Sequence, residues 1–304
     1  MNVLITGGTG FIGKQLIQLL LKEGHSVTNL STQRNQEGVI SKSLQHVYWN
    51  PTSKEINKSL LPEVDAVIHL AGFSVANKWT TANKALMVSS RISSTEFLCE
   101  LLNEMNSKPS VFVGASASGY YKNASELQDE TAEKGSGFLS DLTQQWEEAS
   151  SPLDTSIRKI HLRIGVVLSA NDGALKKLTP IFKAGFGSAV GDGKQYMSWV
   201  HERDLIELFS FCISNNFPAG IYNATSPSPV TNLEFSKTLA QVLKRPFFLP
   251  KTPAFFLKLI FGEMSQLVLV SQRLSNSKIT STGFRFKFNT IQEALTDVYG
   301  KAEN

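Results

Sequence analysis

The sequence has little cysteine and little net charge, and each shortage excludes a class of protein. Only two cysteines occur in 304 residues, both in apolar segments, which predicts small buried side chains in a reducing compartment. The five histidines are scattered and form no cluster with the cysteines, so we expect no metal site. A net charge of +4 is too small to indicate general nucleic-acid binding.

A long uninterrupted apolar run is also missing. The most apolar late stretch, residues 253–270, is broken by Lys258, Gly262 and Glu263, so we expect no membrane-spanning segment and no membrane partner. The chain begins with its first predicted strand, which predicts no signal peptide and a cytoplasmic location. The composition, 41% hydrophobic and 18% charged, is typical of a globular protein with one large or two modest domains.

What the sequence does contain is a glycine turn near its start. An apolar run at residues 3–5 is followed by Gly7, Gly10 and Gly13, then by an amphipathic helix from about Phe11 and a second strand at 25–31. This βαβ context is the one that a dinucleotide-binding motif requires. A plain tight turn is the alternative interpretation.

The turn predicts a diphosphate site. Its backbone N–H groups and the positive end of the following helix would bind the phosphates. A side chain at Gly7 or Gly10 would hold the ligand off the backbone, and Gly13 is expected to let the helix pack closely on the strand. The predicted phosphate-binding residues are Gly7, Thr9, Gly10, Phe11, Ile12 and Gly13.

The end of the second strand predicts the choice of dinucleotide. An acid there would bind the adenosine ribose and favour NAD, but from the end of this strand the chain has no acid until Glu37. Ser31, Thr32 and Arg34 would instead bind a 2′-phosphate, so we expect NADP to be preferred over NAD. The alternative is that Arg34 is a solvated loop cation.

Strand and helix patterns alternate through the first 165 residues, which predicts an α/β fold with a Rossmann-type, doubly wound parallel sheet. Strands are expected within 65–72, 110–115 and 157–167, and helices over 81–105 and 137–150. Residues 1–168 would form the NADP-binding domain, to which 196–226 return, with 220–224 as an added strand. Residues 169–195 and 227–304 would form a smaller, mostly helical C-terminal lobe for the substrate. Asp204 is expected to cap a helix over 205–213.

The C-terminal part of the chain is basic. Between Lys244 and Lys287 there are eight lysines and arginines against one acid, Glu263. This segment is either a solvated basic face or a source of positive potential that attracts an anionic substrate.

Taken together, these motifs resemble the NAD(P)-dependent epimerase/dehydratase branch of the short-chain dehydrogenase/reductase family. The glycine turn has the Thr-Gly-x-x-Gly-x-x-Gly spacing of the extended and atypical members. Further segments resemble the atypical "epimerase family protein" subgroup, which carries a C-terminal domain of unknown function. The segments that carry the resemblance are 65–72, 79–80, 90–92, Ser116, 119–121, 146–147, 162–168, 199–204 and 283–286.

The resemblance implies further cofactor contacts. Leu70, Ala71 and Gly72 would line the riboses, and Arg91 would reach toward the cofactor. Val166 and Val167 would pack near the nicotinamide. In the subgroup the second strand commonly ends in Ser-Arg, whereas this chain has Ser31-Thr32 and its arginine at position 34.

The chain lacks the catalytic pair of the wider family. That family uses Tyr-x-x-x-Lys, in which tyrosine exchanges a proton with the substrate and lysine lowers its pKa. None of the six tyrosines here is followed four residues later by lysine. The remaining candidates are Ser116, Tyr120 and Tyr121, although Ser116 could simply cap a strand end and one tyrosine could belong to the core.

Three functions remain open from the sequence. The favoured one is an NADP-dependent oxidoreductase or epimerase-like enzyme that acts on a small substrate, anionic if the basic segment faces it. The alternative is a non-catalytic NADP-binding sensor or regulatory protein. A nucleotide-sugar epimerase working by another route is least favoured, because the Tyr/Lys pair is missing. Either a monomer or a homodimer is compatible with the sequence.

Overall fold

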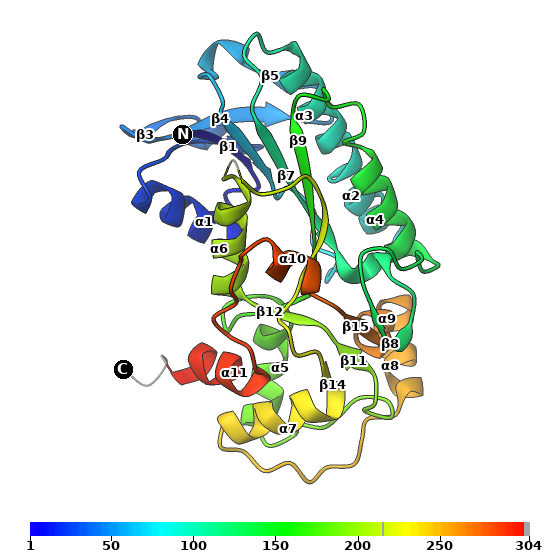
Figure 1. Ribbon diagram of the computed structural model, residues 1–304. Coiled ribbons are helices and arrows are strands. Elements are labelled where there is room, and N and C mark those ends of the chain that lie inside the picture. The colour runs from blue at the N-terminus through cyan, green and yellow to red at the C-terminus, as the bar shows by residue number, and fades with distance from the viewer. Residues whose placement is uncertain (215, 301–304) are drawn as a thin grey trace.

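The computed structural model describes residues 1–214 and 216–300, and a nine-stranded sheet lies at the centre of these residues (Figure 1). Its parallel strands, in spatial order, are β13 (Gly220–Ala224), β9 (Arg158–Ile164), β7 (Val111–Ala117), β6 (Ala66–His69), β1 (Asn2–Thr6), β2 (Ser26–Ser31) and β4 (Leu44–Asn50). The short strands β3 (Gly38–Ser41) and β5 (Glu55–Ile56) pair antiparallel with β4. As expected, residues 220–224 return to this sheet.

The strand order is that of a Rossmann fold. Numbered along the chain, the parallel strands lie in the order 3-2-1-4-5-6-7. The order reverses between β1 and β6, and a crevice outside the carboxyl ends of two such strands is where α/β sheets bind their ligands. The sheet therefore places the predicted glycine turn, which follows β1, at this reversal.

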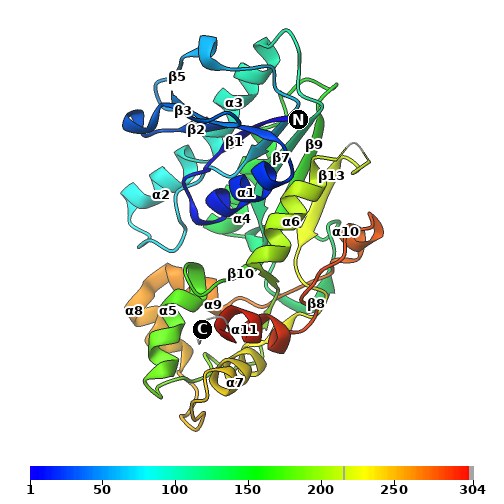
Figure 2. The same cartoon turned by 90° about the vertical axis from the view of Figure 1, so that its left-hand side faces the viewer.

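Helices cover both faces of the sheet (Figures 1 and 2). One face carries α1 (Phe11–Lys22) and α6 (Glu202–Cys212), and the other carries α2 (Thr81–Ser89), α3 (Ile92–Glu104) and α4 (Phe138–Glu148). Successive strand residues point to opposite faces. Val3 and Ile5 accordingly join the core with α1, whereas Leu4 joins the core with α3. The predicted doubly wound α/β fold is confirmed.

A smaller, mostly helical lobe lies beyond the carboxyl ends of the strands (Figure 2). Its separate core includes Phe182, Trp199, Leu239 and Leu295. Its helices are α5 (Gly173–Lys183), α7 (Asn232–Val242), α8 (Ala254–Phe261), α9 (Gln266–Leu269) and α11 (Ile291–Gly300), whereas α10 (Ser277–Ser281) packs against β13 of the main sheet. The remaining strands are β8 (Ala124–Gln128), β10 (Val166–Leu168), β11 (Tyr196–Met197), β12 (Trp199–His201), β14 (Val230–Thr231) and β15 (Gln272–Leu274). Short 3₁₀ turns are η1 (Arg34–Gln36), η2 (Lys58–Leu60), η3 (Ser118–Tyr120) and η4 (Gly262–Ser265).

The expected single helix over 81–105 is wrong, because the chain breaks between α2 and α3. The hydroxyl of Ser90 accepts the N–H of Phe73 at 2.8 Å, and Arg91 becomes the N-cap of α3. Serine side chains compete with helix hydrogen bonds in this way. The break ties the helix pair to the loop after β6 and turns Arg91 toward that loop.

The cap of α6 was also predicted wrongly. The helix begins at Glu202, and Nδ1 of His201 accepts the N–H of Arg203 as the N-cap. Asp204 lies within the first turn, where its carboxylate accepts the N–H groups of Lys287 and Phe288 at 2.9 and 3.2 Å. Asp204 therefore holds a C-terminal segment against α6 instead of capping the helix.

Candidate cofactor and substrate site

The glycine turn is wedged between the ends of β2 and β6. Gly7 has a φ of +73°, and a Cβ there would lie 2.8 Å from the carbonyl carbon of Leu70. A Cβ on Gly8 would lie 2.2 Å from Oδ1 of Asn29, which accepts the Gly8 N–H at 3.1 Å. Both positions thus require glycine for close backbone approach.

Gly13 closes the turn from the helix side. Its Cβ would lie 2.3 Å from the carbonyl oxygen of Gly7 and 2.6 Å from Cα of Gly8. Gly13 thus allows α1 to approach closely the segment that directly follows β1. Gly10, the N-cap of α1, provides no side-chain cap. The first N–H groups of α1, at Phe11 and Ile12, are thus left for a ligand or water.

A directed chain of hydrogen bonds lies beneath the ends of β1 and β6. The N–H of Ala71 donates to Oγ1 of Thr6 at 3.2 Å, and Thr6 contacts Nδ1 of His69 at 2.6 Å. Nε2 of His69 contacts Oγ1 of Thr95 at 2.9 Å, and Thr95 donates to the carbonyl of Arg91 at 2.6 Å. These partners assign the proton of the imidazole to Nε2. The chain connects the loop after β6 with the N-cap of α3.

The imidazole at the middle of this chain is neutral. Burial, with the positive charge of its neighbours His161 and Arg91, lowers the pKa of His69 to about 3. His69 is fully buried and contacts protein groups on both ring nitrogens. It therefore supports the site without facing a ligand.

Arg91 is a half-buried cation at the end of β6. Its Nη1 donates to the carbonyls of Phe73 and Met87 at 2.8 and 3.2 Å, and its guanidinium lies 4.9 Å from the ring centre of Trp146. A Cβ on Gly72 would lie 3.1 Å from its Cζ. Burial lowers the pKa of Arg91 to about 10. Within residues 1–214 and 216–300 no carboxylate pairs with it, so its charge is available to an anionic ligand.

The residues predicted to bind a 2′-phosphate lie at the end of β2. Ser31 is buried and its Oγ accepts the N–H of Gln33 at 3.2 Å, whereas Thr32 is exposed. Arg34 is 66% exposed, forms an ion pair with Glu55 and lies 4.1 Å from the ring centre of Tyr48. The hydrogen bond to Glu55 raises the pKa of Arg34. The guanidinium thus already has an acidic partner.

A buried polar network lies at the carboxyl ends of β7, β9 and β13. Arg163 donates from Nε and Nη2 to the two carboxylate oxygens of Glu147, both at 2.8 Å, and from Nη1 to the Tyr121 hydroxyl at 3.1 Å. Ser116 donates to Oε1 of Glu147 at 2.5 Å. Tyr121 donates to Oδ1 of Asn223 at 2.7 Å. The structure therefore brings two of the three catalytic candidates into one network.

The two adjacent tyrosines have different surroundings. Tyr121 is 2% exposed with its hydroxyl hydrogen-bonded on both sides, and burial raises its pKa to about 12 although Arg163 opposes this. Tyr120 is half-buried, and its ring centre lies 3.4 Å from Cζ of Arg163. Its hydroxyl makes no hydrogen bond to any residue that the structure describes. Of the two, Tyr120 has the hydroxyl that a ligand could meet.

The residues predicted to pack near the nicotinamide begin the lobe. Val166 and Val167 belong to β10, are half-buried, and pair in parallel register with Trp199 and Val200 of β12. Gly165 separates β10 from β9, and a Cβ there would lie 2.5 Å from the carbonyl oxygen of Ser198. The structure thus places this pair at the junction between sheet and lobe.

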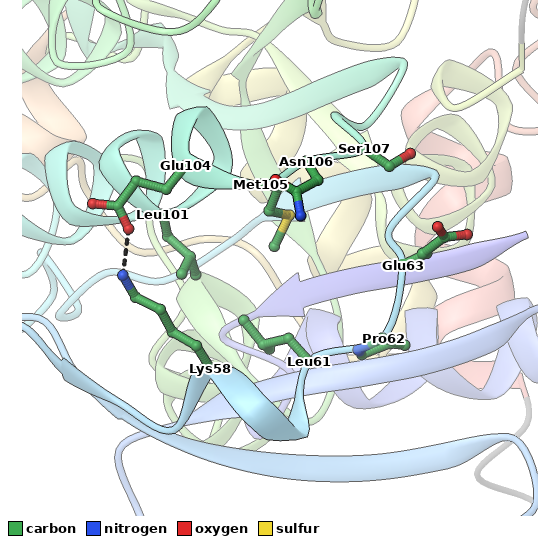
Figure 3. A pocket seen from close by; sticks show the side chains of 9 residues that line it. All are labelled: Lys58, Leu61, Pro62, Glu63, Leu101, Glu104, Met105, Asn106 and Ser107. Carbon is green, nitrogen blue, oxygen red and sulfur yellow. Dashed lines mark hydrogen bonds and ion pairs between the residues drawn. The ribbon is translucent and has the colours of Figure 1, made fainter.

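Two cavities lie outside the buried polar network. One of about 390 Å³ lies at the amino ends of β6 and β7, where Lys58 and Glu104 form an ion pair at its rim (Figure 3). It is therefore at the opposite end of the sheet from the glycine turn. Another of about 500 Å³ lies in the lobe and is lined by Asn123, Gln195 and Lys258 among others. In the described part of the chain, no group of His, Cys, Asp and Glu could hold a metal, and no helix is both long and apolar enough to cross a membrane.

Sequence reasoning missed the groups that support the site. Asn29 and His69 lie within predicted strands, and Glu147 and Arg163 lie within segments that carry the family resemblance. The available signal was a polar or charged side chain within an otherwise apolar segment, since buried polar groups need partners.

Comparison with known proteins gives matches along nearly the whole chain. Residues 3–225 match the NAD dependent epimerase/dehydratase family, and residues 252–298 match a domain of unknown function, DUF1731. Epimerase family protein YfhF of Bacillus subtilis (strain 168) is 35% identical over 301 residues, which cover 98% of each chain.

Solved structures are similar as well. The crystal structure of human epimerase family protein SDR39U1 (isoform 2) with NADPH is 30% identical, with a TM-score of 0.89 and full coverage of both chains. MoeE5 in complex with UDP-glucuronic acid and NAD is 18% identical, with a TM-score of 0.76 over 99% of this chain and 100% of that chain, and at this identity it shows the fold alone.

Proposed function

Since the chain belongs to the NAD dependent epimerase/dehydratase family, we propose that it is an NADP(H)-dependent oxidoreductase or epimerase-like enzyme for a small substrate. The enzyme would work without a Tyr-x-x-x-Lys pair. The main sheet and the helices on its two faces would hold the cofactor, and the lobe beyond the carboxyl ends of the strands would hold the substrate.

The observation that carries this proposal is the glycine turn. Side chains at positions 7, 8 or 13 would collide with backbone or with Asn29, and α1 begins without a side-chain cap. Such a cradle at the reversal of strand order fits a dinucleotide diphosphate. Arg91 supports the same site, because its half-buried charge has no carboxylate partner in the described residues.

Two observations support NADP over NAD. The end of β2 has Ser31, Thr32 and Arg34 and no acid, and the similar human protein was crystallised with NADPH. Arg34 would exchange its bond with Glu55 for one with the 2′-phosphate. An arginine at this place accommodates that phosphate in other NADP-binding folds.

When bound, the nicotinamide supplies or accepts a hydride. The chain's own part would be to hold the substrate and move a proton. Tyr120 would donate or accept that proton at its hydroxyl, since its ring is held over the guanidinium of Arg163 and its hydroxyl has no hydrogen-bond partner among the described residues. Ser116 would accept a hydrogen bond from the substrate, since its own proton is bound to Glu147.

The alternative function is a dinucleotide-responsive sensor. The observation that favours it is that Tyr121 and Ser116 are both held in a closed protein network, which leaves Tyr120 as the sole proton donor of the three candidates. A sensor would bind NADPH in the same cradle but would change its partner affinity instead of reacting.

The test begins with fluorescence titrations of NADPH and NADH, in which NADPH should bind more tightly. Equal affinities would overturn the assignment of Ser31, Thr32 and Arg34. Oxidation of NADPH is then measured against a library of carbonyl compounds. Turnover that Tyr120→Phe slows at least about tenfold supports the enzyme. No turnover, together with a partner whose binding depends on NADPH, supports the sensor. Native mass spectrometry of the purified protein would identify a retained ligand.

A further inference from the structure

Helix α8 carries an apolar face that nothing in the described structure covers. Phe255, Leu259 and Ile260 are 60%, 76% and 69% exposed, and no residue of α8 is buried. With Phe256 they occupy positions i, i+1, i+4 and i+5, which lie on one side of a helix. Isolated apolar side chains on a surface are ordinary, but a contiguous apolar face marks a site of interaction.

The surroundings of this face are basic. Lys251 precedes the helix and Lys258 lies within it, and neither pairs with a carboxylate of a described residue. The Nζ of Lys251 donates to the backbone carbonyl of Asp192 at 2.6 Å. Glu263, the only acid between residues 244 and 287, already pairs with Lys84 of α2. The apolar face thus has exposed positive charge beside it and no neighbouring free acid in its own segment.

The shape is that of a ridge. The helix lies at the edge of the lobe in Figure 1, and its eight residues give a length of about 12 Å. The cavity of about 500 Å³ lies along the side of α8 that carries Ala254 and Lys258. The ridge combines exposed apolar area with nearby lysines, and binding to an anionic membrane interface strengthens with both.

We propose that α8 docks the C-terminal lobe on an anionic lipid bilayer. Phe255, Leu259 and Ile260 enter the boundary between headgroups and acyl chains, and Lys251 and Lys258 lie against the lipid phosphates. The charge distribution favours a bilayer over a second copy of the chain, because pairing two α8 faces would bring four lysines together without an added acid. The expectation of no membrane partner rested on the missing spanning segment, which an interfacial helix does not need.

The proposal is tested by co-sedimentation of the full chain with two kinds of vesicle. One kind is pure phosphatidylcholine, and the other is phosphatidylcholine and phosphatidylglycerol in equal parts. We expect binding to the anionic vesicles that weakens with added NaCl, and at least tenfold weaker binding to phosphatidylcholine. Equal binding to both kinds, or binding to neither, would overturn the proposal.

Matched variants locate the surface. Phe255→Ser/Leu259→Ser should weaken vesicle binding by about tenfold or more, because each buried apolar side chain contributes on that scale. Lys251→Gln/Lys258→Gln should weaken it and remove most of its salt dependence. The control is Val39→Ser/Ile40→Ser, which removes two exposed apolar residues from β3 at the opposite end of the molecule. Thermal unfolding checks that each variant is folded.

A second copy as the occupant would give a different result. Size-exclusion chromatography with light scattering would then show a dimer that Phe255→Ser/Leu259→Ser converts into a monomer, without lipid. That result, or loss of vesicle binding in the β3 control, would refute lipid docking.

Discussion

The hydroxyl of Ser116 donates its proton to the carboxylate of Glu147 over 2.5 Å. Glu147 is itself fixed by two hydrogen bonds from Arg163, so the direction of this bond is set by the protein. Ser116 can therefore accept a hydrogen bond from a ligand but has no proton left to donate. In this site a proton donor must come from another residue, and Tyr120 is the candidate with an available hydroxyl.

Removing the carboxylate of Glu147 should destabilise the fold. Glu147→Gln leaves the buried guanidinium of Arg163 without its counter-charge, and stranding a buried charge costs about 3–5 kcal/mol. Urea unfolding measures this loss. The double variant Glu147→Leu/Arg163→Met should recover part of the stability, because both charges are then removed. A double variant less stable than Glu147→Gln would contradict this account of the pair.

Loss of the hydroxyl should affect stability at one tyrosine and turnover at the other. Tyr121→Phe leaves Oδ1 of Asn223 without its donor and should cost about 1–3 kcal/mol of unfolding free energy. Tyr120→Phe should leave stability nearly unchanged and reduce turnover. Each variant is therefore the control for the other, in thermal unfolding and in NADPH oxidation. Equal stability of the two variants would show that the buried network is not stabilising.

Gly13→Ala should disrupt the diphosphate site. The new Cβ would lie 2.3 Å from the carbonyl oxygen of Gly7, so the turn must move, and overpacking of this kind costs about 1–3 kcal/mol. We expect NADPH affinity to fall at least about tenfold as the turn shifts. The control is Gly300→Ala, where a Cβ meets nothing within 4 Å. Unchanged NADPH affinity in Gly13→Ala would show that the turn does not bind the diphosphate.

The pair of Arg34 and Glu55 should tune the choice of cofactor. Arg34→Gln should weaken NADPH binding without affecting NADH, because only NADPH carries the 2′-phosphate. Glu55→Gln should strengthen NADPH binding, because Arg34 then loses the partner with which the phosphate competes. Fluorescence titration of both cofactors against both variants is the measurement. If Glu55→Gln changes NADPH and NADH affinity alike, Arg34 is a solvated cation.

Acid should unfold the protein partly through its buried histidines. The pKa of His69 is lowered from 6.5 to about 3, so between these values the unfolded state binds a proton that the folded state does not. The contribution of His69 to the free energy of unfolding should therefore be fully present above pH 6.5. Below that pH it should fall by at most about 1.4 kcal/mol per pH unit. In His69→Gln the slope of unfolding free energy against pH should be smaller by up to about 1.4 kcal/mol per pH unit, which corresponds to one proton. Urea unfolding at several pH values measures this slope. An unchanged slope would show that His69 is protonated in the fold.

Features whose residues are close together in the sequence could be predicted, whereas contacts between residues far apart in the sequence could not. The turn of Gly7, Gly10 and Gly13 was predicted because its residues, the preceding strand and the following helix are contiguous. The partner of Asn29 was not predicted, because the sequence pattern does not show that its side chain accepts the N–H of Gly8, 21 residues away. Tyr121 shared its local pattern with Tyr120, and only Arg163 and Asn223, 42 and 102 residues away, distinguish the two.

Missed elements have a similar cause. β4 lies over Leu44–Asn50 and was not predicted, since its polar residues give only a weak alternation. β8 and β15 are short, pair with each other across the chain, and carry no local signal strong enough to reveal the pairing. The break at Ser90 depends on a hydrogen bond from the N–H of Phe73, which lies in the loop between β6 and α2, 17 residues earlier in the chain. The local sequence around Ser90 does not show this contact.

The polar row across three strands has a consequence for folding. Ser116, Arg163 and Asn223 are direct neighbours in register on β7, β9 and β13, whereas Tyr222 and Ala224 belong to the apolar core with α6. If β13 slipped by one residue, Asn223 would enter that apolar core and an apolar side chain would face Arg163. β13 reaches the sheet more than fifty residues after β9 ends, a long loop closure that folds slowly. The row therefore fixes the register of β13. Only when this late strand pairs in the native register does Arg163 have polar neighbours on both adjacent strands.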